Sequence, residues 1–126
     1  MFNHVMVGAN DIDESKQFYD AALGALGIAP GHRDTPERCS YRTDAGTFMI
    51  KLPIDGGAAS AGNGSTIGFL APDEAAIDAW HAAGLANGGT TCEDPPGIRD
   101  RGNVKVYLGY MRDPAGNKLC AVYRLA

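Results

Sequence analysis

The chain has 126 residues, of which 44% are hydrophobic and 21% charged, so it can bury a core and is too apolar for a disordered chain. Eleven Lys and Arg residues against fifteen Asp and Glu residues give a formal net charge of -4, and the basic residues are scattered. This balance argues against nucleic acid and anionic membranes as partners. The longest apolar stretch, residues 21–30, is interrupted by glycine and too short to cross a bilayer.

The cysteines Cys39, Cys92 and Cys120 are odd in number and have no short spacing. Such a pattern suits a reducing compartment better than a framework of disulfides. The first four residues also lack the basic segment that opens a secretory signal. We therefore expect the protein in the cytoplasm.

The first predicted elements are a strand over residues 2–8 and a helix after it. Val5 and Val7 share one face of the strand, because side chains alternate with period two. Asn10 or Asp11 caps the helix, which ends at the glycines near residues 24–27. Its largely apolar stripe comprises Ile12, Ser15, Phe18, Tyr19, Ala22 and Leu23.

Strands are next expected over residues 39–43 and 47–53, joined by a tight turn at 44–46, within a set of two or three antiparallel strands. Residues 55–64 are rich in Gly, Ala and Ser and show no periodicity, which is typical of a flexible connection. This segment divides the chain into a first half, residues 1–54, and a second half, residues 65–126.

The second half begins again like the first, with a strand over residues 65–70 and a helix from Asp73 to about Asn87. The stripe of this helix is expected to bury Ile77, Trp80 and Leu85. Three strands, a loop and a turn follow: strands over 88–92, 104–111 and 118–123, a loop over 93–102 and a turn over 113–116.

The two halves match at a constant offset of 62 residues. The matched pairs are Val5 and Ile67, Val7 and Phe69, Ala9 and Ala71, Asp11 and Asp73, Phe18 and Trp80, Leu23 and Leu85, and Gly27 and Gly89. Aligned caps, apolar positions and glycines indicate two copies of one strand-helix unit, each followed by strands. Amphipathic strand-helix pairs are common, so spacing alone leaves unrelated pairs as an alternative.

The paired βαβββ units and residues 109–118, Gly-Tyr-Met-Arg-Asp-Pro-Ala-Gly-Asn-Lys, resemble the vicinal oxygen chelate superfamily. That superfamily includes glyoxalase I, bleomycin-resistance proteins and extradiol dioxygenases. The likeness covers nearly the whole chain, from His4 to the Asp-Pro-Ala-Gly-Asn turn before the last strand. It implies an α+β domain in which two βαβββ modules form a cup-shaped mixed sheet, with helices on the outer face. It also implies a homodimer.

In metal-dependent members of this superfamily, strands supply His, Glu, His and Glu as ligands. The resemblance places these positions at His4, Lys51, Thr66 and Cys120, and only His4 matches. Lys51 adds positive charge where a carboxylate would cancel it, and Thr66 is a weak neutral ligand. We therefore expect no cofactor. A divalent metal held by His4, Cys120 and an unusual third ligand is the less favoured alternative.

The resemblance places Leu108 and Tyr110 on the wall of the cup, where they would form an apolar surface with one hydroxyl. Lys51 would anchor an anionic or carbonyl group there. The candidate ligand-binding residues are His4, Lys51, Thr66, Leu108, Tyr110 and Cys120. Each also has a structural interpretation, such as a solvated lysine or a small buried cysteine, and no catalytic residue is assigned.

Three functions follow from this interpretation. The first is a protein of the glyoxalase and bleomycin-resistance type that binds a small, partly apolar ligand in the cup without the inherited metal. The second is a metal-dependent lyase, isomerase or dioxygenase with divergent ligands. The third is an interaction module whose cup is filled by its own side chains. The sequence leaves open whether the protein is an enzyme.

Overall fold

The computed structural model describes residues 1–125, so Ala126, the last residue of the predicted second half, lies outside the described residues. Module one contains β1 (His4–Gly8), α1 (Ile12–Ala25), β2 (His32–Thr35), β3 (Arg38–Thr43) and β4 (Gly46–Lys51). Module two contains β5 (Ile67–Leu70), α2 (Glu74–Ala86), β6 (Thr90–Thr91), β7 (Gly97–Asp100), β8 (Lys105–Arg112) and β9 (Lys118–Arg124). Neither helix of this described part is long and apolar enough to cross a membrane.

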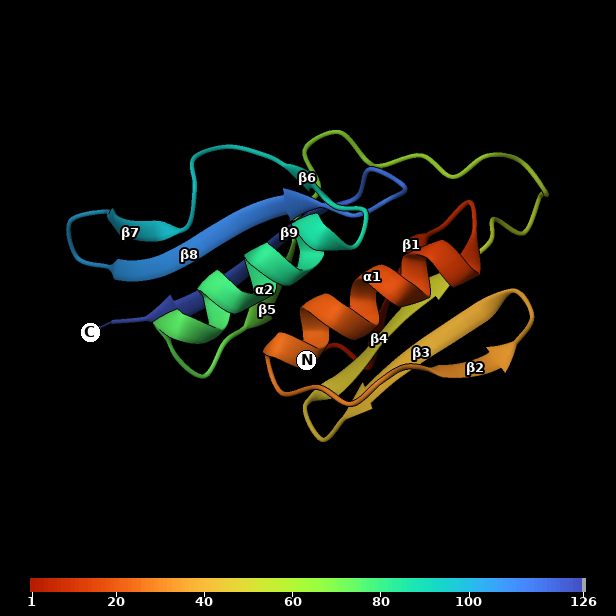
Figure 1. Ribbon diagram of the computed structural model, residues 1–126, viewed down its shortest axis with the longest axis horizontal. Coiled ribbons are helices and arrows are strands. Elements are labelled where there is room, and N and C mark those ends of the chain that lie inside the picture. Colours follow the sequence, from red (N-terminus) through yellow and green to blue (C-terminus); the bar gives the residue numbers. More distant parts are fainter. Residues whose placement is uncertain (126) are drawn as a thin grey trace.

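Each module folds into one mixed sheet. The first sheet has the order β1-β4-β3-β2, and the second has the order β5-β9-β8-β6, with β7 also pairing with β8. In both sheets the first strand runs parallel to the last, and the other pairs are antiparallel. The two helices lie side by side over one face of the sheets (Figure 1). The α+β fold class with two related modules is therefore confirmed; module one is βαβββ, and module two follows the same order with one additional strand, because β6 and β7 each pair with part of β8.

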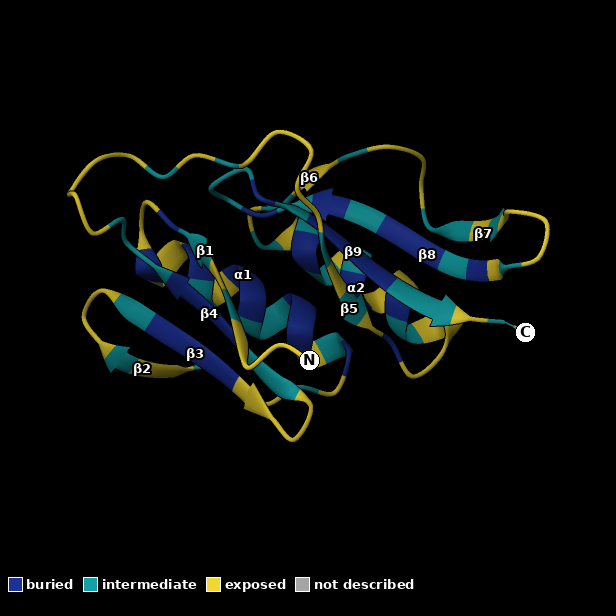
Figure 2. Cartoon of the chain, turned by 180° about the vertical axis from the view of Figure 1, so that it is seen from behind, coloured by how far each residue is buried: buried dark blue, intermediate teal, exposed yellow. Residues whose placement is uncertain are grey.

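We call the face that α1 and α2 cover the helix face, and the opposite one the open face. Figure 2 shows the molecule from the side of the open face, with the helices behind the strands. Both predicted caps are present: Asp11 accepts a hydrogen bond from the Glu14 N–H at 3.1 Å, and Asp73 accepts one from the Ala76 N–H at 2.8 Å.

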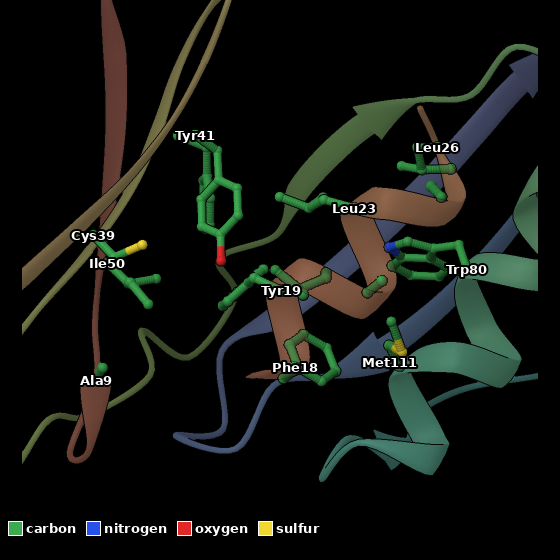
Figure 3. Close-up of a cluster of buried hydrophobic side chains, with 14 of the residues drawn as sticks. Ala9, Phe18, Tyr19, Leu23, Leu26, Cys39, Tyr41, Ile50, Trp80 and Met111 are labelled. Carbon is green, nitrogen blue, oxygen red and sulfur yellow. The ribbon is translucent and has the colours of Figure 1, made fainter. Parts of the chain in front are cut away.

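The helix-face core draws on both modules (Figure 3). Phe18 of α1 and Trp80 of α2 are fully buried, and the rings of Phe48 and Phe69 meet across the modules with centroids 5.2 Å apart. Gly84 allows α2 to approach the second sheet closely, because a Cβ there would lie 2.2 Å from Met111 Cε.

The Asp-Pro-Ala-Gly-Asn turn fastens module two to module one. Asp113 is 3% exposed, and its Oδ2 accepts hydrogen bonds from the Tyr19 hydroxyl at 2.5 Å and the Asn117 amide at 2.8 Å. The Asn117 amide also donates to the Gly8 carbonyl at 2.9 Å. Burial, together with the Asp113 carboxylate, raises the pKa of Tyr19 well above its ordinary value, so Tyr19 donates as a neutral phenol.

Three details of the sequence interpretation change. The predicted loop over residues 93–102 is wrong at its centre, because β7 forms there and pairs with β8. The strand expected from residue 65 begins at Ile67, since the Ser65 N–H is bonded to Gly62 in a turn. Leu85, expected in the buried stripe, is half-buried, and Gly84 beside it is buried against Met111 instead.

Candidate functional site

Strand pairing identifies the side chains of the open face, because residues directly opposite each other on neighbouring strands point to the same side. On the first sheet these include His4 and Met6 of β1, Arg38, Ser40 and Arg42 of β3, and Thr47, Met49 and Lys51 of β4. On the second sheet they include Leu70 of β5, Val106, Leu108, Tyr110 and Arg112 of β8, and Lys118, Cys120, Val122 and Arg124 of β9.

The open face of the second sheet carries its own apolar cluster. Val106, Leu108 and Cys120 are buried there, and Val104, Tyr110 and Val122 pack against them. This cluster is separate from the helix-face core. Lys118 Nζ lies 4.9 Å from the centre of the Tyr110 ring, so a cation rests on the aromatic part of the same wall. The structure thus brings Leu108, Tyr110 and Cys120 together.

Two cavities of the described residues adjoin the open face. The first, about 410 Å³, lies between the edges of β1 and β5, where His4 and Leu70 of the open face line it together with helix-face residues such as Tyr41, Phe48 and Phe69. The second, about 650 Å³, lies between the first sheet and the segment that follows β4, and Lys51 lines it together with Arg38.

The polar candidates do not share one cavity. His4 is paired with Thr47, and Lys51 with Gly8, so the two lie four residues apart along parallel strands. At about 3.3 Å per residue, that separation is roughly 13 Å. Thr66 is exposed, precedes β5 and lines neither of these cavities. A single small ligand would therefore contact a subset of the six candidates.

The environments of His4 and Cys120 limit their chemistry. His4 Nδ1 lies 2.8 Å from the Asn3 side-chain amide, which donates to it and leaves the Nε2 position free of this contact. Burial, followed by the nearby Glu93 carboxylate, raises the pKa of Cys120. The thiol is therefore a poor nucleophile at neutral pH, since nucleophilic attack needs the thiolate.

The inherited metal positions do not form a suitable donor set. Within residues 1–125, no three His, Cys, Asp or Glu side chains lie close enough together to hold an ion. The Lys51 ammonium donates to the Leu52 carbonyl at 3.3 Å, and it stands at the position where the resemblance implies a carboxylate ligand. The residues present therefore do not fit a divalent cation, which requires several oxygen, nitrogen or thiolate donors.

Arg38 is a site residue that sequence reasoning missed. It lies directly opposite Lys51 in the β3–β4 pair and lines the same cavity. The signal was present in the predicted turn at residues 44–46, because counting outward from a hairpin turn pairs the residues of its two strands. Applied to Thr43 and Gly46, that count reaches Arg38 and Lys51.

Comparisons with known proteins agree with this architecture. Residues 1–121 match the family model of the Glyoxalase/Bleomycin resistance protein/Dioxygenase superfamily. The crystal structure of a glyoxalase/bleomycin resistance protein from Albidiferax ferrireducens T118 is similar over 98% of this chain and 99% of that one, with 60% identity and a TM-score of 0.94. No curated protein matches the chain significantly.

More distant structures share the fold. A glyoxalase-related enzyme from Fulvimarina pelagi is 19% identical over 97% of this chain and 86% of that one, with a TM-score of 0.73. Lactoylglutathione lyase from Agrobacterium tumefaciens is 21% identical over 97% of this chain and 92% of that one, with a TM-score of 0.65. Taken with the family match over residues 1–121, these findings mean that the chain belongs to the glyoxalase/bleomycin resistance protein/dioxygenase superfamily.

Proposed function

We propose that this protein binds a small, partly apolar organic ligand on its open face and does so without the inherited metal. The observation that carries the proposal is the cluster of Val106, Leu108 and Cys120, which is buried on a sheet face that neither helix covers. Small-molecule sites in proteins are mostly apolar and contain a few placed polar groups. Here the apolar wall of module two bears the Tyr110 hydroxyl, and the cavity of about 650 Å³ in module one bears the Lys51 ammonium.

Two activities fit such a site. The protein sequesters its ligand, or it carries out metal-free proton chemistry on it. In the second case His4 is the candidate acid or base, because its imidazole is exposed on the open face and the Asn3 amide orients its ring.

A thermal-shift screen tests ligand binding, because a compound that binds the native state raises its melting temperature. The panel contains aromatic compounds, thiol conjugates and antibiotics. Compounds that stabilise the protein are expected to lose this effect in Tyr110→Ala. The matched control is Tyr107→Ala, since Tyr107 lies on the helix face of the same strand and donates to Asp78 at 2.7 Å. A panel without any stabilising compound would contradict the proposal.

The metal-dependent alternative has its own test. Protein purified without chelator is expected to contain far less than one equivalent of zinc, nickel, manganese or iron by elemental analysis. Neither nickel nor zinc is expected to activate turnover of a glutathione hemithioacetal. Stoichiometric metal, together with turnover that His4→Ala abolishes, would reassign the protein as a metal-dependent lyase, isomerase or dioxygenase.

We also propose that two copies of the chain pair as a homodimer. Within residues 1–125, β1 and β5 each have a strand partner on one side only, so both present an open sheet edge. Apolar side chains flank these edges, with Phe2 74% and Leu70 81% exposed. A second copy would cover both features. Sedimentation at micromolar concentration is expected to give the dimer mass, and a monomer would contradict this assignment.

The cytoplasm is the proposed location, on the basis of the cysteines. Cys39, Cys92 and Cys120 are all free thiols, and two of them are buried. Free thiols persist in a reducing compartment. Fractionation of cells that express the tagged protein is expected to recover it with cytoplasmic markers, and recovery in a secreted fraction would contradict this proposal.

A further inference from the structure

Two cations face each other on the open face of module one. Arg38 and Lys51 are directly opposite in the β3–β4 pair, and both line the cavity of about 650 Å³. Like charges directly opposite on neighbouring strands destabilise a sheet. A negative charge between or beside the two side chains would therefore relieve the repulsion between Arg38 and Lys51.

The described residues supply little of that charge. The ion pairs found among residues 1–125 include none that involves Lys51. Arg38 Nε lies 3.5 Å from Asp34 Oδ2, yet it is buried without a hydrogen bond among the described residues. The Asp34 carboxylate already accepts from the Ser40 hydroxyl, and from Arg42 Nη1 at 3.2 Å. The Asp34 carboxylate is thus shared by Arg38 and Arg42, and Lys51 has no ion-pair partner among the described residues.

Asp55 is the carboxylate that lines this cavity. Its Oδ1 accepts a hydrogen bond from the Gly57 N–H at 2.9 Å, which holds it within the turn after β4. Among the pairs found in residues 1–125, Asp55 therefore forms no direct ion pair with either cation.

A hydrogen bond fixes the part of the connecting segment that lines the cavity, residues 58–60. The Asn10 side-chain carbonyl accepts a hydrogen bond from the Ala59 N–H at 2.7 Å, which ties the connecting segment to the end of β1. Gly8 allows this approach, because a Cβ there would lie 3.0 Å from Ala59 Cβ. The remaining wall is largely apolar and includes Met6, Leu52 and Ile54. The two cations thus border a partly apolar groove that opens to solvent at Ile54, which is 96% exposed.

We propose that Arg38 and Lys51 bind the carboxylate of an organic acid whose carbon skeleton lies along Met6, Leu52 and Ile54. This inference rests on the proposed function, and it names the class of ligand as an apolar organic carboxylate. Arginine and lysine form short, charge-assisted hydrogen bonds with carboxylates, which are about twice as strong as neutral ones. The apolar wall favours an organic acid over an inorganic anion, because an inorganic anion has no apolar surface to bury against it.

Isothermal titration with a matched pair of probes tests this inference. 4-Phenylbutyrate carries the carboxylate, 4-phenylbutyramide has the same skeleton without the charge, and inorganic phosphate has the charge without the skeleton. The acid is expected to bind the wild-type protein about tenfold or more tightly than the amide, as loss of a charged hydrogen bond implies. Phosphate is expected to bind more weakly than the acid.

Variants locate the binding. Arg38→Met and Lys51→Met are each expected to weaken binding of 4-phenylbutyrate about tenfold or more. Arg42→Met is the matched control, since Arg42 shares the strand and the face of Arg38 but does not line the cavity, and its affinity is expected to change less than threefold.

The outcomes separate this inference from the function it rests on. Equal binding of acid and amide, phosphate binding tighter than the acid, or full affinity in both Met variants would each overturn the carboxylate subsite. So would failure of 4-phenylbutyrate to bind at millimolar concentration. Ligand binding on the open face would stand in all these cases, provided that compounds in the thermal-shift panel still lose their effect in Tyr110→Ala.

Discussion

On the helix face, Phe18 of module one and Trp80 of module two occupy equivalent positions, and both are fully buried. On the open face, module one presents Arg38 and Lys51, whereas module two presents a wall around Leu108. Phe18 and Trp80 must both be large and apolar, because both rings fill the same close-packed core. No helix covers the open face, so its residues diverge without loss of the fold. The differences between the modules therefore coincide with the face on which we propose that the ligand binds.

Removal of the two equivalent rings should have the largest effect. Phe18→Ala and Trp80→Ala are each expected to lower the free energy of unfolding by about 3–5 kcal/mol, the range for large aromatic side chains in cores. Chemical denaturation measures both values. If one substitution lowers the free energy of unfolding by less than about 1 kcal/mol, as a surface substitution does, that ring does not contribute to the core as its equivalent in the other module does.

The turns before the last strand of each module should respond unequally. Asp113→Ala is expected to cost about 3 kcal/mol, because it leaves the buried Tyr19 hydroxyl and Asn117 amide without their acceptor. Asp44, in the corresponding turn of module one, is exposed, and Asp44→Ala should cost less than about 0.5 kcal/mol. Equal losses in urea denaturation would show that the Asp113 turn does not fasten the modules together.

Removal of one cation from the open face of module one should stabilise the ligand-free protein. Lys51→Met is expected to raise the free energy of unfolding by about 0.5 kcal/mol, because it ends the repulsion with Arg38. Lys105→Met provides a control, since Lys105 pairs with Asp100 at 3.9 Å. A decrease in the melting temperature of Lys51→Met would mean that Lys51 makes an attractive interaction in the ligand-free protein that outweighs its repulsion with Arg38.

The smallest expected effect concerns pH. Burial acts to raise the pKa of Asp20, but hydrogen bonds from Lys16, Gly31 and Tyr41 outweigh it and lower the pKa below the ordinary 3.8. The folded state therefore holds this proton less tightly than the unfolded state. The resulting stability is present above about pH 4 and is lost as the pH falls through the folded pKa. Asp20→Asn should flatten the decline of melting temperature below pH 4, and an unchanged profile would contradict this assignment.

Much of the fold could be predicted because local rules determine it. The Asp11 and Asp73 caps, the buried stripe of α1 and the turn at residues 113–116 all follow from short-range hydrogen bonds and helical spacing. The strand β7 could not be predicted, because it has only four residues and shows no apolar alternation; its one large apolar side chain, Ile98, is exposed.

The site was less predictable, because its parts meet only in three dimensions. The direction of Lys51 followed from alternation along β4, where Phe48 and Ile50 are buried. The position of residues 58–60 depends on the contact between Asn10 and Ala59, which are 49 residues apart. No periodicity signals such a contact, and the separation of His4 from Lys51 likewise required the strand register.

Metal-free ligand binding on the open face can be seen directly in a crystal structure of the protein with a compound from the thermal-shift screen, recorded with anomalous data for transition metals. The compound is expected to lie against Leu108 and Tyr110 or beside Lys51, with no ion at His4, Thr66 or Cys120. A metal ion held by His4 and Cys120, or a compound bound away from the open face, would contradict this expectation.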